Sequence, residues 1–184
     1  MHEVILESSD KMEKSVEAFK NELAKIRTGR ASLSILDDIS VDAYGSSMPL
    51  NQVGTITIPE SRMIVIQPWD PQMLPAIEKG IQKSGIGLNP IGDGKVIRLN
   101  IPQLTEERRK DLVKLVRKFA EEFRVAVRNV RRDAIETLKK QKKDKEISED
   151  ELFKFQDEVQ SETDLYIKEI DEVTAHKEKE VMEV

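Results

Sequence analysis

The longest regular pattern of apolar positions in the chain runs from Thr105 to Lys145. This stretch contains neither Gly nor Pro, and its apolar residues recur at steps of three and four, as on one face of an amphipathic helix. At ~1.5 Å per residue the predicted helix is roughly 60 Å long. Its apolar stripe consists of Leu112, Val116, Phe119, Phe123, Ala126, Val130, Ala134 and Leu138.

A second helix is predicted over residues 3–28. We expect Gly29 to be its left-handed C-terminal cap, and Lys25 and Arg27 lie in the predicted last turn, where cations suit the helix dipole. The apolar stripe of this helix consists of Val4, Ile5, Met12, Val16, Phe19, Leu23 and Ile26.

A third helix begins at Ser148 and runs nearly to the end of the sequence, because Ser148 and Glu151 have the spacing of a capping box. A single amphipathic helix cannot bury its stripe alone. We therefore predict that the three long helices pack as an elongated antiparallel bundle. The third stripe consists of Leu152, Phe155, Val159, Tyr166, Ile170, Val173 and Val181.

The pattern between the first two helices is different and predicts a small α+β unit. Asp70 can cap a short helix that has Pro71 at its first position and ends near Lys83. Glycine-rich loops follow this helix at residues 85–94, and residues 45–49 are read as a turn. Alternating or continuous apolar runs predict strands at residues 39–44, 52–58, 63–67 and 96–101.

The expected domain organisation follows from this order. Residues 1–29 and 105–184 form the three-helix bundle, and residues 30–104 form an inserted β/α/β domain. Two chain crossings join them, and a two-strand connection is a natural hinge. The predicted hinge residues are Gly29, Arg30, Ala31, Pro102, Gln103 and Leu104.

The composition excludes several classes of protein. The chain has no Cys and therefore no disulfide framework, and no apolar run approaches the ~18 residues of a membrane span. With 35% charged and 4% aromatic residues, it suits long solvated helices better than a broad core. We expect a soluble cytoplasmic protein that does not associate with membranes.

No catalytic constellation is visible, so we predict no enzyme, metal site or cofactor. The chain has two histidines, His2 and His176, which lie near the termini. Two histidines in these positions are too few for a Ser–His–Asp triad or a His-based metal site. Residues 85–87 lack the third Gly of a dinucleotide loop. Residues 92–95 lack the ending of a phosphate loop, so both segments are read as turns.

The distribution of charge on the helix predicted over residues 105–145 suggests a binding function. Thr105–Lys145 holds 15 Lys and Arg against 8 Asp and Glu, a net charge of +7 in a chain of net charge −5. At ~100° per residue, a basic sector opposite the apolar stripe contains Glu121 as its one acid. Its basic members are Lys110, Lys114, Arg117, Arg124, Arg128, Arg131, Arg132 and Lys139.

Three interpretations of this sector remain open from the residues themselves. It can be a solvated face, it can bind an acidic protein as a scaffold, or it can bind RNA or DNA. The arginines favour nucleic acid, because a guanidinium contacts phosphate in a bidentate manner and stacks on bases. The acids of the third helix are expected to be solvated. An alternative hypothesis for the whole protein is an enzyme that uses a nucleotide, with its active site in the α+β unit.

Four segments resemble the ribosome recycling factor family, and the resemblance covers the whole chain. They are residues 25–32 (KIRTGRAS), 104–110 (LTEERRK), 125–134 (VAVRNVRRDA) and 144–150 (DKEISED).

This resemblance implies an L-shaped monomer that binds the post-termination ribosome across the tRNA sites of the large subunit. Elongation factor G with GTP then acts, the subunits separate, and mRNA and tRNA are released; the GTPase activity belongs to the elongation factor. By similarity, Arg131 with Arg128 and Arg132 would be the principal contacts to rRNA. Further expected contacts are Arg124, Arg117, Arg109, Arg27 and Arg30, whereas the lysines at 139–143 receive no role.

Overall fold

The computed structural model describes residues 2–183, which divide into two compact units. Met1–Thr28 and Thr105–Val184 form the first, here called the helical unit, and Gly29–Leu104 form the second, here called the mixed unit. The chain therefore leaves the first unit once, builds the second, and returns.

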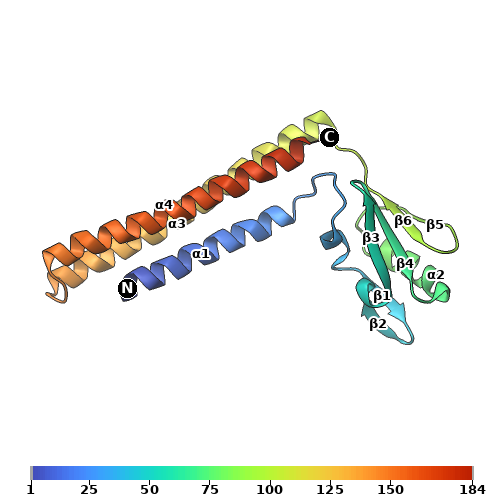
Figure 1. Ribbon diagram of the computed structural model, residues 1–184, viewed down its shortest axis with the longest axis horizontal. Helices are drawn as coiled ribbons and strands as arrows, with labels where there is room; N and C mark the ends of the chain where they lie inside the picture. Colours follow the sequence, from blue (N-terminus) through green and yellow to red (C-terminus); the bar gives the residue numbers. More distant parts are fainter. Residues whose placement is uncertain (1, 184) are drawn as a thin grey trace. The chain divides into compact units, whose positions relative to one another are not determined.

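Three long helices form the helical unit: α1 (Glu3–Ala24), α3 (Glu106–Lys143) and α4 (Glu149–Met182). They lie side by side, and each reverses the chain direction of the helix before it (Figure 1). Thr105 caps α3, and Ser148 with Glu151 forms the predicted capping box of α4. The predicted antiparallel three-helix bundle is thus confirmed.

The bundle is held by apolar side chains that all three helices contribute. Phe19 of α1 is fully buried, and its ring centroid lies 5.3 Å from that of Phe123. The predicted stripe of α3 was partly wrong: Ala126 is half-buried, whereas Ala120 and Val127 are fully buried. Helix α3 packs against both α1 and α4, so its buried face is wider than the predicted stripe and includes Ala120 and Val127.

The end of α1 was also predicted wrongly. The helix ends at Ala24, so Lys25 and Arg27 lie beyond its last turn. Gly29 does have a positive φ of 78°, but it is not the cap of α1. The Thr28 hydroxyl donates to Glu180 Oε1 on α4 at 2.9 Å, so a tertiary bond directs the chain here instead of a continued helix.

The mixed unit contains two antiparallel sheets and one helix. A two-stranded sheet pairs β1 with β2, and a four-stranded sheet has the order β3-β4-β6-β5. Helix α2 (Leu74–Lys83) follows a 3₁₀ turn at Pro71–Met73, which Asp70 caps as predicted. The strands are β1 (Ser40–Ala43), β2 (Ser46–Pro49), β3 (Gly54–Glu60), β4 (Met63–Pro68), β5 (Pro90–Gly92) and β6 (Ile97–Asn100).

Two of these strands were missed, because β2 was expected to be a turn and β5 a loop. Neither has an alternating apolar pattern, and each forms a strand because it pairs with a neighbouring one: Ser46 pairs with Ala43, and Ile91 with Arg98.

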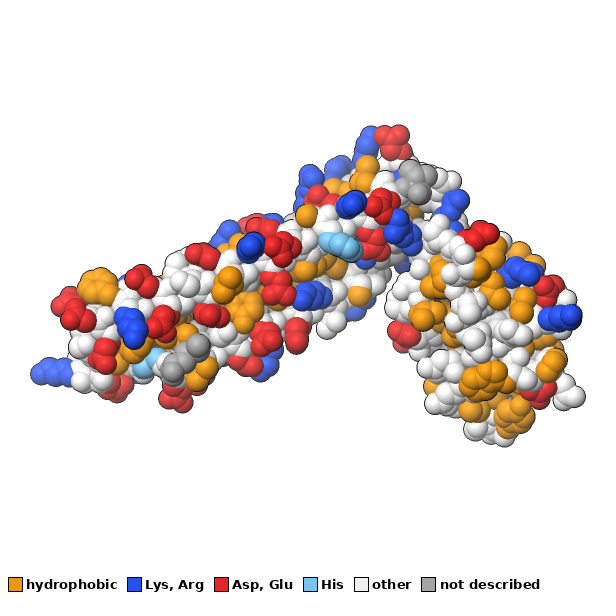
Figure 2. Space-filling model, viewed as in Figure 1, with side chains coloured by type: hydrophobic (Ala, Val, Ile, Leu, Met, Phe, Trp, Pro, Cys, Tyr) orange, Lys and Arg blue, Asp and Glu red, His pale blue; other side chains and the backbone are white. Residues whose placement is uncertain are grey.

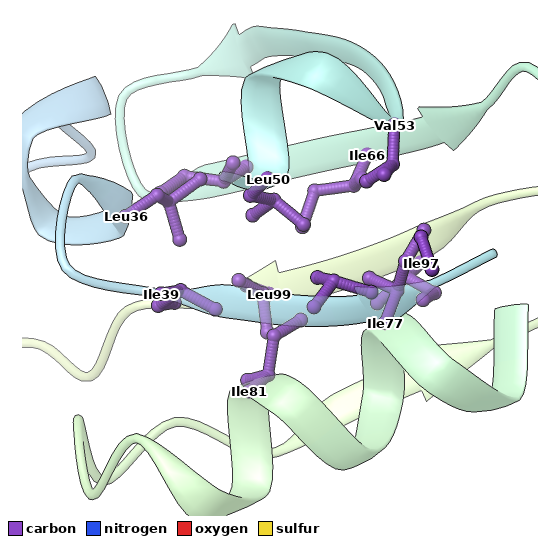
Figure 3. Close-up of a cluster of buried hydrophobic side chains, with 12 residues drawn as sticks. Leu36, Ile39, Leu50, Val53, Ile66, Ile77, Ile81, Ile97 and Leu99 are labelled. Carbon is purple, nitrogen blue, oxygen red and sulfur yellow. The ribbon is translucent and has the colours of Figure 1, made fainter. Parts of the chain in front are cut away.

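A compact core lies between the sheets and α2 (Figure 3). It includes Leu36, Ile39, Leu50, Val53, Ile66, Ile77, Ile81, Ile97 and Leu99.

Candidate nucleic-acid interface

The basic sector of α3 does not all point away from the bundle. Arg124 follows the fully buried Ala120 by four positions, and Arg131 follows the fully buried Val127 in the same way. Residues four apart share a helix face, so both arginines lie half-buried at the edge of the core. The expectation that the whole sector is opposite the apolar face was therefore wrong.

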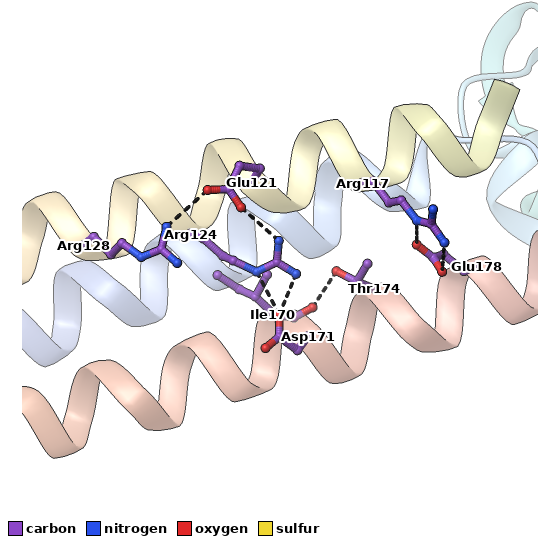
Figure 4. Close-up of polar contacts among 8 residues, drawn as sticks. All are labelled: Arg117, Glu121, Arg124, Arg128, Ile170, Asp171, Thr174 and Glu178. Atoms are coloured by element: carbon purple, nitrogen blue, oxygen red, sulfur yellow. Dashed lines mark hydrogen bonds and ion pairs between the residues drawn. The ribbon is translucent and has the colours of Figure 1, made fainter.

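Arg124 is held by carboxylates on two helices (Figure 4). Its Nε and Nη2 donate to Asp171 Oδ1 on α4 at 2.8 and 2.6 Å, and its Nη1 donates to Glu121 Oε2 at 3.2 Å. Its side chain is only 23% exposed. Three of the five N–H groups of this guanidinium thus contact carboxylates, which leaves Arg124 less available to a phosphate than an unpaired arginine.

Arg117 and Arg128 are also paired. Arg117 donates to both oxygens of Glu178 on α4, at 2.7 and 3.3 Å, and this bond raises the pKa of the guanidinium above its ordinary value. Arg128 donates to Glu121 Oε1 at 3.2 Å. The acids of α4 were expected to be solvated, but Asp171 and Glu178 face basic side chains of α3 across the helix contact.

Arg131 has a neutral partner instead of a carboxylate. Its Nη1 donates to Gln160 Oε1 on α4 at 3.3 Å, and Gln160 Nε2 donates to Asp164 at 2.8 Å. Such a long bond to an uncharged amide is weaker than an ion pair. The guanidinium charge of Arg131 is therefore not neutralised by direct pairing.

Arg132 is the most open of the three central arginines. It is exposed, and it makes no ion pair with any residue between 2 and 183. Lys139, two turns further along α3, is likewise exposed and unpaired within that range. Together with Arg131 they form what we call the open basic stripe, defined as Arg131, Arg132 and Lys139.

The other three predicted site residues lie elsewhere. Arg109 packs against the end of α4, where its Nη1 donates to the Met182 carbonyl at 3.3 Å and its Nε is buried. A cation there suits the carbonyl end of a helix. Arg27 and Arg30 are exposed and belong to the helical and the mixed unit respectively, outside α3.

The predicted hinge residues all fall in the mixed unit. A Cβ on Gly29 would lie 3.1 Å from Leu104 Cγ, so the two ends of this unit meet closely. The Ala31 N–H donates to the Ser61 carbonyl at 2.7 Å. Residues 101–105, which include Pro102 and Gln103, have no regular secondary structure.

Features expected to lack chemistry have structural roles. His2 caps α1 by accepting from the Val4 N–H, and its ring lies 4.4 Å from that of Phe155.

Asp93 accepts from the N–H groups of Val96 and Lys95, and these bonds, with a further one from Arg98, lower the pKa of its carboxyl to about 2. Residues 2–183 include no cluster of three or more potential metal ligands.

Comparison with known proteins decides the family. The family model described as ribosome recycling factor matches residues 19–182. The chain belongs to the ribosome recycling factor family. A ribosome-recycling factor of Desulfotalea psychrophila is 77% identical over all 184 residues of this chain and covers 100% of both chains. One from Nitratidesulfovibrio vulgaris is 54% identical over 184 residues, covering 100% of this chain and 99% of the relative.

Solved structures of ribosome recycling factors have the same fold. A solution structure of one matches with a TM-score of 0.78 and 48% identity, covering 98% of this chain and 96% of the other. A second match, with a TM-score of 0.64 and 46% identity, covers 98% of each chain. It comes from models of the T. thermophilus ribosome recycling factor and the E. coli elongation factor G bound to the E. coli post-termination complex.

Family membership confirms the recognition that the four sequence segments carried. The ribosome recycling factor family consists of non-catalytic translation factors, which agrees with the prediction that the chain is no enzyme. Among the helices within residues 2–183, none is long and apolar enough to cross a membrane. The residue assignments stay predictions, because likeness to a family does not test individual side chains.

Proposed function

We propose that this protein binds the post-termination ribosome through α3, lying across the tRNA sites of the large subunit. With elongation factor G and GTP it then separates the subunits, so that mRNA and tRNA are released. The proposal rests on the full-length match to a ribosome-recycling factor and on a solved relative placed with elongation factor G on a post-termination complex. The protein acts as a monomer in the cytoplasm, where ribosomes work.

The observation that carries the RNA contact is the difference between paired and open arginines on α3. Arg117 and Arg124 donate to Glu178 and Asp171 and thereby hold α3 against α4. Arg131 and Arg132 are not bonded to a carboxylate within residues 2–183. We assign the principal phosphate contacts to Arg131 and Arg132, and a supporting contact to Arg128, whose carboxylate partner lies 3.2 Å away.

Phosphate contacts of this kind position a protein on nucleic acid without reading its sequence. The action then depends on the rigid helices and on movement at the two chain crossings. We propose that Gly29, Arg30 and Ala31, with Pro102–Leu104, form the hinge between the units. Nucleotide hydrolysis belongs to elongation factor G, so the isolated protein has no GTPase or ATPase activity.

The decisive experiment measures binding to purified large subunits across a salt series, followed by subunit splitting with elongation factor G and GTP. Arg132→Ala is expected to weaken binding and splitting together. Lys168→Ala is the matched control, because it removes one exposed charge from α4 instead of α3. Equal losses in the two variants would show that total charge, and not the open basic stripe, governs binding.

The hinge has its own test. Solution scattering and NMR relaxation of the full chain should show two units that tumble separately, because few residues connect them. A single rigid body that fits the data at all temperatures would contradict the hinge and leave the RNA contact unaffected.

A further inference from the structure

A groove of about 460 Å³ opens on the mixed unit. Its apolar lining includes Leu33, which is 50% exposed, Trp69, which is 67% exposed, and the buried Leu36 and Leu50. Large apolar side chains left open together mark interaction sites on soluble proteins. Figure 2 shows fewer charged side chains over the lower part of the mixed unit than over the helical unit, whose surface carries charges of both signs.

The groove runs beside the free edge of a sheet. Strand β3 is paired with β4 alone and lies at the edge of the four-stranded sheet. Gly54, Thr55 and Ile56, from the first half of β3, line the groove. A ligand in the groove would therefore lie against backbone as well as side chains.

The register shows which backbone groups of β3 point outward. The Trp69 N–H donates to the Val53 carbonyl at 3.1 Å, so Val53 occupies a bonded position of the ladder, although its own N–H donates to the Leu50 carbonyl at 3.2 Å. Bonded and non-bonded positions alternate along an antiparallel ladder. Gly54 and Pro68 are therefore a non-bonded pair, a position that Pro, which has no N–H, can occupy without losing a ladder bond. Ile56 is two positions from Gly54 and so turns its N–H and C=O away from β4, toward the edge.

The remaining edges of this sheet are blunted in the ways that natural proteins use against unwanted pairing. Strand β5 at the other edge is three residues long and begins with Pro90. The second half of β3 contains Pro59 and a register shift between Thr57 and Glu60. The stretch around Ile56 lacks such protection, and it is the stretch beside the groove.

We propose that this groove is a docking site for an extended segment of a partner protein, which adds as a strand to β3. Strand addition obtains affinity from main-chain bonds and specificity from side-chain pockets. The segment places one bulky apolar side chain between Leu33 and Trp69. It carries Lys or Arg next to that side chain, because Asp37 is the one charged residue among those lining the groove.

The probe is a library of eight-residue peptides selected against the full chain, with binding read from the fluorescence of Trp69, the single tryptophan. Selected peptides are expected to share an apolar residue flanked by Lys or Arg. Methylating alternate peptide nitrogens should weaken binding about tenfold or more, because it removes ladder bonds. The Ile56 amide should become protected from hydrogen exchange.

Variants separate this groove from general stickiness. Leu33→Ser should weaken binding of a selected peptide about tenfold, and Asp37→Asn should reduce its dependence on salt. Ile91→Ser on β5 is the matched control, since Ile91 is 52% exposed at the opposite edge, and it should leave binding unchanged. The proposal is overturned if no peptide is selected, if acidic peptides prevail, if N-methylation has no effect, or if Ile91→Ser weakens binding as much as Leu33→Ser.

Discussion

Arg124 of α3 and Asp171 of α4 form the closest ion pair between these two helices, with Arg124 Nη2 2.6 Å from Asp171 Oδ1. Arg124 also reaches Glu121 on its own helix at 3.2 Å. A residue that the sequence places in an RNA-binding sector thus fastens the bundle. The distinction between arginines that fasten α3 and arginines that remain open gives the tests below.

The pair should contribute measurably to stability. Exposed ion pairs contribute ~0.2–1 kcal/mol, and we expect about 1 kcal/mol here because Arg124 is largely covered. A double-mutant cycle of Arg124→Ala and Asp171→Ala, followed by denaturant unfolding, measures this coupling. The control cycle uses Lys168 and Glu172, an exposed pair at 3.8 Å on α4. Equal coupling in both cycles would argue against a fastening role for Arg124.

Arg131→Ala should affect ribosome binding far more than folding. Losing the 3.3 Å bond to Gln160 and some packing should lower stability by about 1 kcal/mol. Losing a charge-assisted phosphate contact should weaken large-subunit binding about ten- to a hundredfold. The slope of log affinity against log salt should also become shallower by about one unit. Arg131→Lys should restore only part of the binding, because Lys lacks the planar fork.

The opposite result would relocate the contact. If Arg131→Ala splits ribosomes like the parent while Lys139→Ala does not, the binding site lies nearer the tip of the bundle. Arg132→Ala provides a further check, since an exposed side chain without pairing should change stability by less than about 0.5 kcal/mol.

Thr28→Val should loosen the chain where it leaves the helical unit. Thr28 is 7% exposed and donates to Glu180, whose other oxygen lies 3.6 Å from Lys177 Nζ. We expect a loss of about 1 kcal/mol in the free energy of unfolding, typical of one hydrogen bond. Thr137→Val is the control, because the Thr137 hydroxyl bonds only within α3 and is exposed. A larger loss in the control would show that the tertiary bond is unimportant.

Stability should fall in acid partly through the turn at Asp93. Bonds from the backbone of Val96 and Lys95 lower the pKa of this carboxyl to about 2, against about 3.9 in an unfolded chain. A carboxyl with a depressed pKa stabilises the fold above its unfolded pKa, and this contribution disappears as the pH falls through about 2. Asp93→Asn should flatten the decline of stability between pH 4 and pH 2. An NMR titration midpoint of Asp93 near its ordinary value would contradict the assignment.

The sequence by itself determined the three helices, the capping box at Ser148 and most strands of the mixed unit. These features depend on local chemistry: apolar spacing, side chains that cap backbone N–H groups, and Pro or Gly at turns. The resemblance to the family could also be recognised from the sequence, because Arg128, Arg131 and Arg132 belong to one contiguous segment. Strands β2 and β5 could not be predicted from the sequence, since their conformation depends on the strands that pair with them.

Tertiary structure alone decided which arginines are open. Arg124 and Arg131 lie seven positions apart on the same face of α3, yet one meets Asp171 and the other the neutral Gln160. The sequence pattern of α3 cannot predict this difference, because the partner residues belong to α4. Which residue of α4 lies opposite each arginine depends on how the two helices pack. The end of α1 is of the same kind: Thr28 bonds to Glu180 at a sequence separation of 152 residues, and a contact so distant along the chain leaves no local pattern.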